Sequence, residues 1–319
     1  MTMLPASLVS ARWLAEHLAA PGLVVLDASY HLPAAARDAA ADFAAGHIPG
    51  ARFLDLASLF DPASPVPYAF PIPAQLAERL SGLGVGPDDA LIIYDDSAIR
   101  TSARAWFVLT ASGRGDVAIL DGGLGKWRAE GLPVESGMPD TSAAAPSSFA
   151  APTRVRSKAD MLSNLDTRAS QVLDARSADR VYGTGIDPVH GGQNGRIPGA
   201  LNLPFTDVLN ADGTYKSPDE LRALFAQAGV DLAAREDPRD EVDLLGHLVH
   251  AVLPRHTHDD EGLVREAQVG LQRQQARFFD RAQRFEVIAA PAHLGLLGVD
   301  GVQLQVDALA GAQVLGALD

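Results

Sequence analysis

The sequence predicts an α/β chain built from two versions of one unit, each a mostly parallel sheet flanked by helices. The main observation is a hexapeptide that occurs twice, because Gly-His-Ile-Pro-Gly-Ala at 46–51 returns as Gly-Arg-Ile-Pro-Gly-Ala at 195–200. A helical pattern follows each copy, over 73–85 and over 218–230, with the same offset of 145 residues at both of its ends (73 to 218 and 85 to 230). Solenoid repeats are far shorter, so this period indicates duplication of a whole domain.

A buried strand that ends in a carboxylate is expected before each hexapeptide. The two runs are Val-Val-Leu-Asp-Ala at 24–28 and Val-Leu-Asp-Ala at 172–175. Short apolar runs of this kind are typical of buried strands. In the hexapeptide itself, Pro fixes φ and Gly adopts φ values that other residues avoid. The pattern therefore predicts strand, fixed turn and new strand in both units.

Composition supports two globular domains and excludes some partners. The chain has 319 residues, of which 47% are hydrophobic and 21% are charged, as in ordinary globular chains of two domains. Its net charge is −14, from 26 basic and 40 acidic residues, so no basic surface is available for a nucleic acid. No apolar run approaches membrane-spanning length and no signal peptide is recognised. We therefore expect no nucleic-acid partner, no membrane partner and a cytoplasmic location.

The first unit carries ordinary helix and strand signals. Ser10 is expected to cap an amphipathic helix over 11–18, and a buried strand follows at 23–26. Pro73 opens a second helix, which stops at Gly84, with Pro at the start and Gly at the end as helices prefer.

The most strand-like run of the chain is Ala-Leu-Ile-Ile-Tyr at 90–94. It is apolar on both faces, as in the middle of a parallel sheet. A polar loop over 95–101 and a helix from about Ser102 to Thr110 follow it. A strand, a loop and a helix N-terminus together form a cradle for an anion. Asp95 stands at the centre of this cradle, and its carboxylate is expected to fill the cradle from within.

A glycine-rich stretch follows the next predicted strand, Val-Ala-Ile-Leu at 117–120. It reads Asp-Gly-Gly-Leu-Gly-Lys-Trp and ends at Trp127. A phosphate-binding P-loop needs Ser or Thr after Gly-Lys, and no G-x-G-x-x-G follows the first strand. We therefore expect a structural turn with a packed Trp here and no nucleotide site.

These motifs, taken together, resemble those of the two-domain sulfurtransferases of the rhodanese and 3-mercaptopyruvate type, over about residues 8–234. They are Leu-Asp-Ala-Ser at 26–29, Gly-His-Ile-Pro-Gly-Ala at 46–51, Tyr-Asp-Asp at 94–96, Ala-Arg-Ala-Trp at 103–106 and Asp-Gly-Gly at 121–123 with Trp127. The resemblance implies tandem rhodanese-like domains, of which the first is a non-catalytic copy with Asp95 at the cradle position. It also implies a small anionic sulfur donor such as thiosulfate or mercaptopyruvate, and no cofactor.

The expected domain borders follow from the repeat and from composition. The first rhodanese-like domain covers 1–137, and the Ala-, Ser- and Pro-rich stretch 138–157 is the linker. The second domain starts at 158 and keeps the pattern to 234. Residues 235–319 are expected to be an aberrant C-terminal segment.

The second unit contains a segment, 174–184, that looks like the family's substrate-binding segment. By this match, Arg180 holds the sulfonate or carboxylate of the donor, which suits a planar guanidinium group. The alternative from the residues alone is an ordinary ion pair with a nearby Asp on the surface. Arg196 stands where the family usually has His, and Ala57 and Tyr68 stand where the mercaptopyruvate branch has Asp and His. Mercaptopyruvate specificity is therefore not expected.

The sequence contains no cysteine. This absence removes disulfides, thiolate metal sites and every cysteine nucleophile. The offset of 145 carries Asp95 to Asp240, and family spacing puts the nucleophilic cysteine at about the same place. The residues over 235–240 are Arg-Glu-Asp-Pro-Arg-Asp, which cannot form a buried central strand. The second domain is therefore expected to be incomplete or altered after about residue 235, through a frame change, a junction or divergence.

Three functions remain open at this point. The first is a sulfurtransferase family member that is inactive because the nucleophile is missing. The second is a non-catalytic rhodanese-like protein that binds a small anion or acts as a scaffold. The third is a different enzyme with a metal site among His247, His250, His256 and His258 with Asp259 and Asp260. Their spacing matches no defined metal motif, so no metal site is expected.

Overall fold

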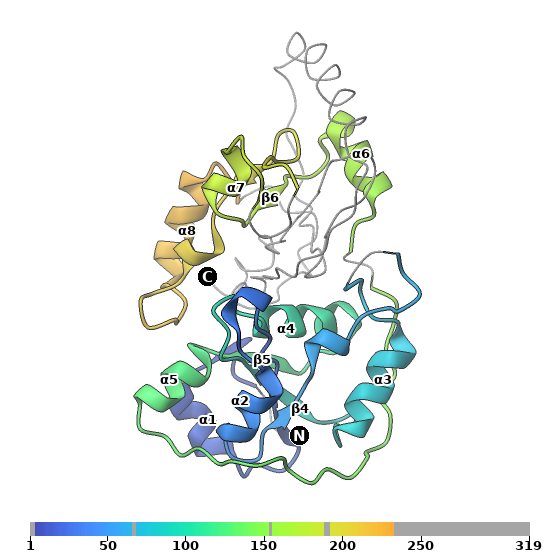
Figure 1. The fold of residues 1–319 in the computed structure, drawn as a ribbon, viewed down its shortest axis with the longest axis vertical. Helices are drawn as coiled ribbons and strands as arrows, with labels where there is room; N and C mark the ends of the chain where they lie inside the picture. The colour runs from blue at the N-terminus through green and yellow to red at the C-terminus, as the bar shows by residue number, and fades with distance from the viewer. Residues whose placement is uncertain (1–3, 66–67, 153–154, 188–191, 233–319) are drawn as a thin grey trace.

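The computed structural model describes residues 4–65, 68–152, 155–187 and 192–232 (Figure 1). The first unit forms the lower body in Figure 1, and the helices and strands of the second unit lie above it. The expected C-terminal segment 235–319, Asp240 and the His- and Asp-rich positions lie outside the described residues.

The first unit is built on one sheet of five parallel strands in the order β1-β5-β4-β2-β3. The strands are β1 (Leu8–Val9), β2 (Leu23–Asp27), β3 (Arg52–Phe53), β4 (Ala90–Tyr94) and β5 (Val117–Leu120). Strand β4 pairs with β2 on one side and with β5 on the other. All five of its side chains are buried, and Ile92 and Ile93 are 0% exposed. The prediction of 90–94 as the central strand is confirmed.

Helices cover both faces of this sheet. They are α1 (Ala11–His17), α2 (Ala39–Ala45), α3 (Pro73–Gly82), α4 (Ser102–Ala111) and α5 (Gly123–Ala129), with short 3-10 turns η1 (Pro33–Ala35) and η2 (Leu56–Ser58). Ile93 packs in one apolar cluster with side chains of α3 and α4. Its neighbour Ile92 packs in a second cluster with side chains of α1, α2 and α5. Alternate residues of the central strand therefore hold the two outer layers.

The local helix signals act as expected. The Ser10 side chain accepts a hydrogen bond from the Trp13 backbone N–H at 3.1 Å and caps α1. Pro73 lies in the first turn of α3, and Gly84, just beyond its end, has φ +71°. A side chain there would lie 2.7 Å from the Ser142 carbonyl oxygen, so the chain reversal requires glycine.

The glycine-rich stretch after β5 is a structural turn, as predicted. Gly123 has φ +57°, and a Cβ at this position would lie 2.3 Å from the Asp95 carbonyl oxygen. Trp127 is fully buried, and its Nε1–H donates a hydrogen bond to the Pro133 carbonyl at 2.7 Å. The close approach of the turn to the Asp95 loop therefore explains the glycine.

The second unit contains α6 (Lys158–Thr167), β6 (Leu173–Asp174), α7 (Ala178–Tyr182), β7 (Leu201–Asn202), η3 (Phe205–Val208) and α8 (Pro218–Gln227). Strands β6 and β7 form a parallel pair. The Ser217 hydroxyl and the Glu220 carboxylate form the expected capping box at the start of α8. Between α5 and α6, the described residues 138–152 and 155–157 contain no helix or strand.

The two Ile-Pro-Gly-Ala turns have the same backbone hydrogen bond. The Ala51 N–H donates to the Ile48 carbonyl at 2.9 Å, and the Ala200 N–H donates to the Ile197 carbonyl at 3.0 Å. The glycine before each alanine has φ +74° in the first turn and +83° in the second. Each turn leads into a short strand that pairs in parallel, β3 with β2 and β7 with β6.

Within the described residues, no helix has the length and apolar character needed to cross a membrane. The same part of the chain contains no group of three or more His, Cys, Asp or Glu residues that could hold a metal ion.

The central position of β4 makes a specific stability prediction. Ile92→Ala should lower the free energy of unfolding by about 2 to 5 kcal/mol, because the cavity between the sheet and α1 would remain partly unfilled. The control is Ile72→Ala at the start of α3, since Ile72 is 47% exposed and its loss should cost about 0.5 kcal/mol. Urea unfolding followed by tryptophan fluorescence measures both. Equal losses in the two variants would contradict the buried central strand.

Candidate functional site

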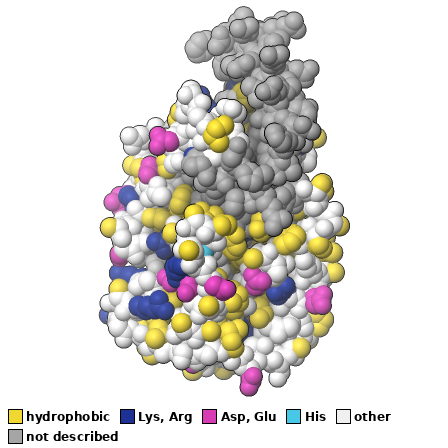
Figure 2. All heavy atoms as spheres, in the orientation of Figure 1, with side chains coloured by type: hydrophobic (Ala, Val, Ile, Leu, Met, Phe, Trp, Pro, Cys, Tyr) yellow, Lys and Arg dark blue, Asp and Glu magenta, His cyan; other side chains and the backbone are white. Residues whose placement is uncertain are grey.

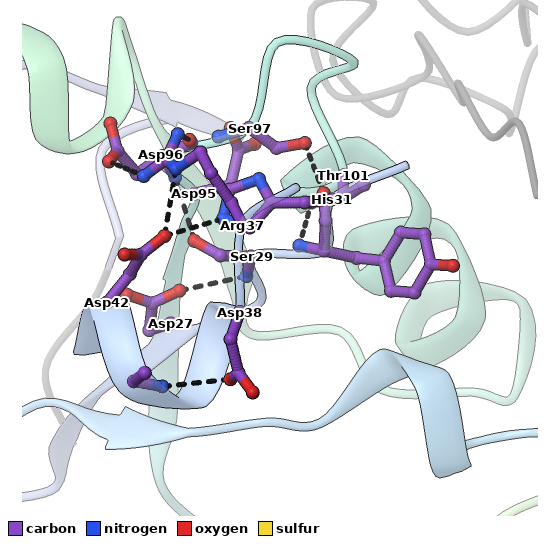
Figure 3. Close-up of polar contacts among 12 residues, drawn as sticks. Asp27, Ser29, His31, Arg37, Asp38, Asp42, Asp95, Asp96, Ser97 and Thr101 are labelled. Atoms are coloured by element: carbon purple, nitrogen blue, oxygen red, sulfur yellow. Dashed lines mark hydrogen bonds and ion pairs between the residues drawn. The ribbon is translucent and has the colours of Figure 1, made fainter. Parts of the chain in front are cut away.

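Two buried carboxyl groups mark the edge of the sheet where β2 and β4 end (Figure 3). They belong to Asp27, the last residue of β2, and Asp95, which follows β4, and each residue is 2% exposed. Each accepts a hydrogen bond from the backbone N–H two residues later, Ser29 to Asp27 at 2.8 Å and Ser97 to Asp95 at 2.9 Å. Carboxyl ends of parallel strands are where open α/β sheets bind their ligands.

Both oxygens of Asp95 are engaged by backbone donors. Oδ1 accepts the bond from Ser97, and Oδ2 accepts a bond from the N–H of Ser102, the first residue of α4, at 2.8 Å. The residue before the helix, Thr101, provides no side-chain cap. The Asp95 carboxylate therefore caps α4 and lies at the positive end of its dipole.

Hydroxyl groups join the two loops that follow β2 and β4. Ser97 Oγ donates to the Tyr30 carbonyl at 2.5 Å, and Thr101 Oγ1 donates to the Ala28 carbonyl at 2.7 Å. Thr101 Oγ1 also accepts a bond from the Tyr30 N–H at 3.2 Å. These bonds satisfy backbone groups at the sheet edge without a ligand.

A layer of ionic side chains covers this edge. Arg37 Nε lies 2.9 Å from Asp42 Oδ2, and Arg37 Nη2 lies 2.7 Å from Asp96 Oδ2. His31 Nε2 lies 3.1 Å from the same Asp42 oxygen, and the His31 side chain is buried. Figure 2 shows basic and acidic side chains next to one another on this face of the molecule. Exposed pairs of this kind contribute little to stability, but they hold the loop after β2 over the cradle.

Tyr94 connects Asp27 to the first Ile-Pro-Gly turn. Its hydroxyl accepts a hydrogen bond from the Ile48 N–H at 3.3 Å and is also hydrogen-bonded to Asp27. Burial raises the pKa of Asp27 to about 6, and hydrogen bonds from Ser29 and Tyr94 oppose that rise. Burial also raises the pKa of Tyr94, and the charge of Asp27 adds to this rise.

The two Ile-Pro-Gly turns have different anchors. In the first, Glu135 Oε1 accepts a bond from the Gly50 N–H at 2.6 Å and lies 3.2 Å from His47 Nε2. In the second, Arg196 takes the place of the histidine, and its guanidinium carbon lies 4.5 Å from the centre of the Tyr182 ring. Arg196 therefore makes a cation–π contact in place of the histidine–carboxylate contact.

Arg180 lies on α7 in the second unit, and Figure 1 places α7 and β4 in different halves of the molecule. Arg180 is 8% exposed, and its Nε donates to Asp187 Oδ2 at 2.9 Å. The structure thus shows the ion pair with a nearby aspartate, although this pair is buried and not on the surface. Sequence analysis does not identify Asp187 as the partner of Arg180. The sequence shows only that an acidic residue stands seven positions after Arg180, which does not distinguish Asp187 from other nearby aspartates.

Ala57 and Tyr68, which the sequence analysis expects in place of the mercaptopyruvate branch's Asp and His, lie in the loop between β3 and α3. Ala57 lies in η2, and its N–H donates to Asp55 Oδ1 at 2.9 Å. The Tyr68 ring lies 5.6 Å from the Phe60 ring and 6.5 Å from the Tyr30 ring, centre to centre. Aromatic packing therefore occupies this part of the first unit.

The second unit contacts the first at the carboxyl end of β5. The Tyr215 N–H donates to Asp121 Oδ1 at 2.9 Å, and Lys126 Nζ lies 2.9 Å from Asp212 Oδ2. Asp121 directly follows β5, and burial raises its pKa. A loop of the second unit therefore covers one more strand end of the first sheet.

The raised pKa of Asp27 predicts a pH-dependent effect of Asp27→Asn. The folded value of about 6 exceeds the ordinary value of 3.8, so the stability that this carboxyl contributes is present below about pH 3.8 and is lost as the pH rises through 6. Asparagine does not ionise. The stability of Asp27→Asn relative to wild type should therefore increase by about 2 kcal/mol between about pH 4 and about pH 7.

Urea unfolding at the two pH values measures this difference. Asp88→Asn, at an exposed position, controls for the loss of one negative charge. A difference between Asp27→Asn and wild type that stays constant with pH would contradict the raised pKa.

Comparison with known proteins gives the family. The Rhodanese-like domain model matches residues 10–130. The 3-mercaptopyruvate sulfurtransferase of Mus musculus is 40% identical over 233 residues, which cover 71% of this chain and 78% of the mouse protein. The thiosulfate sulfurtransferase of Bos taurus is 36% identical over 236 residues, with the same two shares.

A solved structure agrees with these matches. The crystal structure of the 3-mercaptopyruvate sulfotransferase SseA from Escherichia coli superposes with a TM-score of 0.66 at 35% identity, covering 72% of this chain and 86% of SseA. The expected α/β fold with a parallel central sheet flanked by helices is confirmed. This chain therefore belongs to the family of thiosulfate and 3-mercaptopyruvate sulfurtransferases with the rhodanese fold.

Proposed function

We propose that this chain is a member of the family without sulfurtransferase turnover. The observation that carries the proposal is the absence of cysteine from all 319 residues. Sulfur transfer requires a group that attacks the donor sulfur, holds it as a persulfide and then releases it. A thiolate does each of these steps. The carboxylate, hydroxyl and imidazole groups of this chain cannot form a persulfide.

The cradle position in the first unit supports the proposal. Asp95 stands there, and the donors that a persulfide anion would need already bind its carboxylate. The corresponding position in the second unit is Asp240 by the repeat offset. Neither position provides a thiol, and Asp95 is best explained as the non-catalytic cradle residue.

The proposed domain organisation follows the sequence-based borders. The domains are a first rhodanese-like domain over 1–137, a linker over 138–157, the start of a second domain over 158–234, and a segment foreign to the fold over 235–319. The matching hydrogen bonds of the two Ile-Pro-Gly turns support the duplication. The match to the mouse relative covers 71% of the chain, which is also the share that residues 8–234 make up.

A frame change or a junction near codon 234 explains in one step why the strand, loop and nucleophile motifs of the family are missing from the sequence beyond it. We expect another reading frame beyond that codon to encode a Cys-Gly-Ser-Gly-like loop, followed by Asp-Gly-Ser and Trp. Translation of the gene in its two other frames tests this expectation. If neither frame contains those motifs in that order, the frame-change explanation is wrong.

A second candidate is a non-catalytic rhodanese-like protein that binds a small anion, such as thiosulfate or mercaptopyruvate, or acts as a scaffold. The buried Arg180 on α7 favours it, because guanidinium groups recognise sulfonate and carboxylate groups in a planar geometry. Binding without turnover distinguishes this candidate from an active enzyme. A cytoplasmic location also remains a prediction.

Two turnover assays test the main proposal directly. The purified chain should release no thiocyanate from thiosulfate and cyanide, and no pyruvate from mercaptopyruvate and a thiol acceptor, above the rate without protein. The 3-mercaptopyruvate sulfurtransferase of Escherichia coli, which is 37% identical, is the positive control for mercaptopyruvate. Turnover that scales with the concentration of the cysteine-free chain would contradict the proposal.

A further inference from the structure

The segment that follows α5 is attached to the first Ile-Pro-Gly turn by its backbone. We call residues 132–137 the strap. The backbones of Glu135 and His47 exchange two hydrogen bonds, each 2.9 Å long, as an antiparallel bridge. Two residues later, the Gly137 N–H donates to the Ala44 carbonyl at 2.8 Å. The strap therefore holds the chain that leads to the second unit against this turn.

The strap has little apolar burial to keep it in place. All of residues 133–137 are exposed, and Val134 is 48% exposed. The Glu135 side chain is also exposed, although its carboxylate reaches back to the turn. Segments with few buried apolar contacts open more readily than the core does. The polar contacts of the strap therefore decide how firmly it is attached.

The main polar contact is with His47, which is 1% exposed and has both ring nitrogens next to acceptors. Nδ1 lies 2.8 Å from the Phe43 carbonyl oxygen, and Nε2 lies 3.2 Å from Glu135 Oε1. A carbonyl oxygen can only accept, and Glu135 Oε1 already accepts a bond from the Gly50 N–H at 2.6 Å. Hydrogen bonds at both ring nitrogens therefore require a proton on each, which is the imidazolium form.

The surroundings of the His47 ring suit a positive charge. The ring stacks on that of Phe43, with centres 3.9 Å apart and planes 10° apart, and the face of an aromatic ring attracts cations. The Glu135 carboxylate supplies the compensating negative charge, as a buried cation requires.

The other charged and titratable groups around the turn have partners of their own. They are Arg128 on α5, Asp42 on α2, Asp27 on β2 and Tyr94 on β4. Arg128 Nη2 donates to the Gly46 carbonyl at 2.9 Å, and Asp42 pairs with Arg37. Asp27 is hydrogen-bonded to Tyr94. Glu135 is thus the carboxylate that lies within ion-pair distance of the His47 ring in the described part of the chain.

We propose that His47 and Glu135 form a pH-sensitive latch that holds the strap on the first Ile-Pro-Gly turn. The latch is closed while both ring nitrogens carry a proton. As the pH rises and His47 loses one proton, the remaining N–H serves only one of the two acceptors. The bond to Phe43 is the shorter one, so the proton stays on Nδ1, and the lone pair of Nε2 then faces the carboxylate. This repulsion opens the latch and loosens the strap.

Helix α1 contains a matched histidine without the carboxylate. His17 Nδ1 lies 2.7 Å from the carbonyl oxygen of Trp13, four residues earlier, and the two rings stack with centres 4.2 Å apart. His47 makes the same two contacts with Phe43, also four residues earlier. In the described residues, the ion pairs of histidine involve His31 and His47 and not His17. His17 is therefore the control for the latch.

His47→Gln in the full chain tests the latch through amide hydrogen exchange of Glu135 and Gly137. Protection, corrected for the intrinsic exchange rate, is measured at about pH 5 and about pH 8, the ends of the range in which histidine changes charge. In wild type it should fall at least about tenfold at the higher pH, as expected for the loss of one charge-assisted hydrogen bond. His47→Gln should be less protected than wild type at about pH 5 and should show no such fall, because glutamine does not titrate.

His17→Gln should behave as wild type in the same experiment. The Asp27 carboxyl, whose pKa is raised to about 6, titrates in all of these proteins, so it does not contribute to the differences between them. A wild-type protection that does not change with pH, or an equal fall in His47→Gln, would show that the latch does not exist.

A second substitution tests the carboxylate. Glu135→Gln keeps an acceptor oxygen for the Gly50 N–H but removes the charge, and the side chain is 44% exposed, so the fold should tolerate it. The pH dependence of the protection should disappear in this variant. Its survival would exclude Glu135 as the partner.

A measurement on wild type covers the case in which His47→Gln fails to fold. Long-range proton–nitrogen NMR of the labelled His47 ring should show two similar nitrogen shifts at about pH 5, as in imidazolium, and the split pair of the Nδ1–H tautomer at about pH 8. Any other pair of ring states would overturn the proposal. These readouts concern the strap alone and do not depend on whether the chain transfers sulfur.

Discussion

The carboxyl-end edge of the sheet in the first unit depends on one interaction, the pair of hydrogen bonds that backbone N–H groups donate to the Asp95 carboxylate. The carboxylate caps α4 and fixes the loop after β4 through Ser97 and Ser102. The backbone carbonyl of the same residue accepts a bond from the Leu124 N–H at 3.0 Å, which holds the start of α5. Gly123 is required at this contact, because any side chain would collide with that carbonyl. One aspartate thus organises two helix starts, and the sheet edge is satisfied without a ligand.

The same solution recurs in the second unit with different residues. There, a buried Asp187 oxygen lies 2.9 Å from Arg180 Nε and 3.7 Å from Arg176 Nη1. In both units, a carboxylate of the protein itself satisfies buried donors, the backbone N–H groups at Asp95 and the guanidinium groups at Asp187. The folded chain thus meets these polar groups without a ligand.

Local signals made much of the fold predictable. The apolar run of β4, the Ser10 cap and the capping box at Ser217 each depend on a few consecutive residues, so the sequence indicates them directly. Strand β1 and helix α2 were missed, because two residues have no period and an alanine-rich segment has no apolar stripe. In the site, the position of Asp95 is predictable because the residue directly follows the strand β4. Its contact with Ser102 is also predictable, because only the short loop from 95 to 102 separates the two residues. The contact of Tyr215 with Asp121 could not be predicted, because it joins residues far apart in the chain.

The central claim is that this chain cannot accept sulfur, whatever donor it binds. The most direct measurement is the half-reaction, in which the purified chain is incubated with thiosulfate labelled in its outer sulfur and then denatured. We predict no protein-bound label and an unchanged intact mass, while the bovine thiosulfate sulfurtransferase treated in parallel gains one sulfur atom per active site. Label that stays on this chain after denaturation, with a matching increase in intact mass, would contradict the claim.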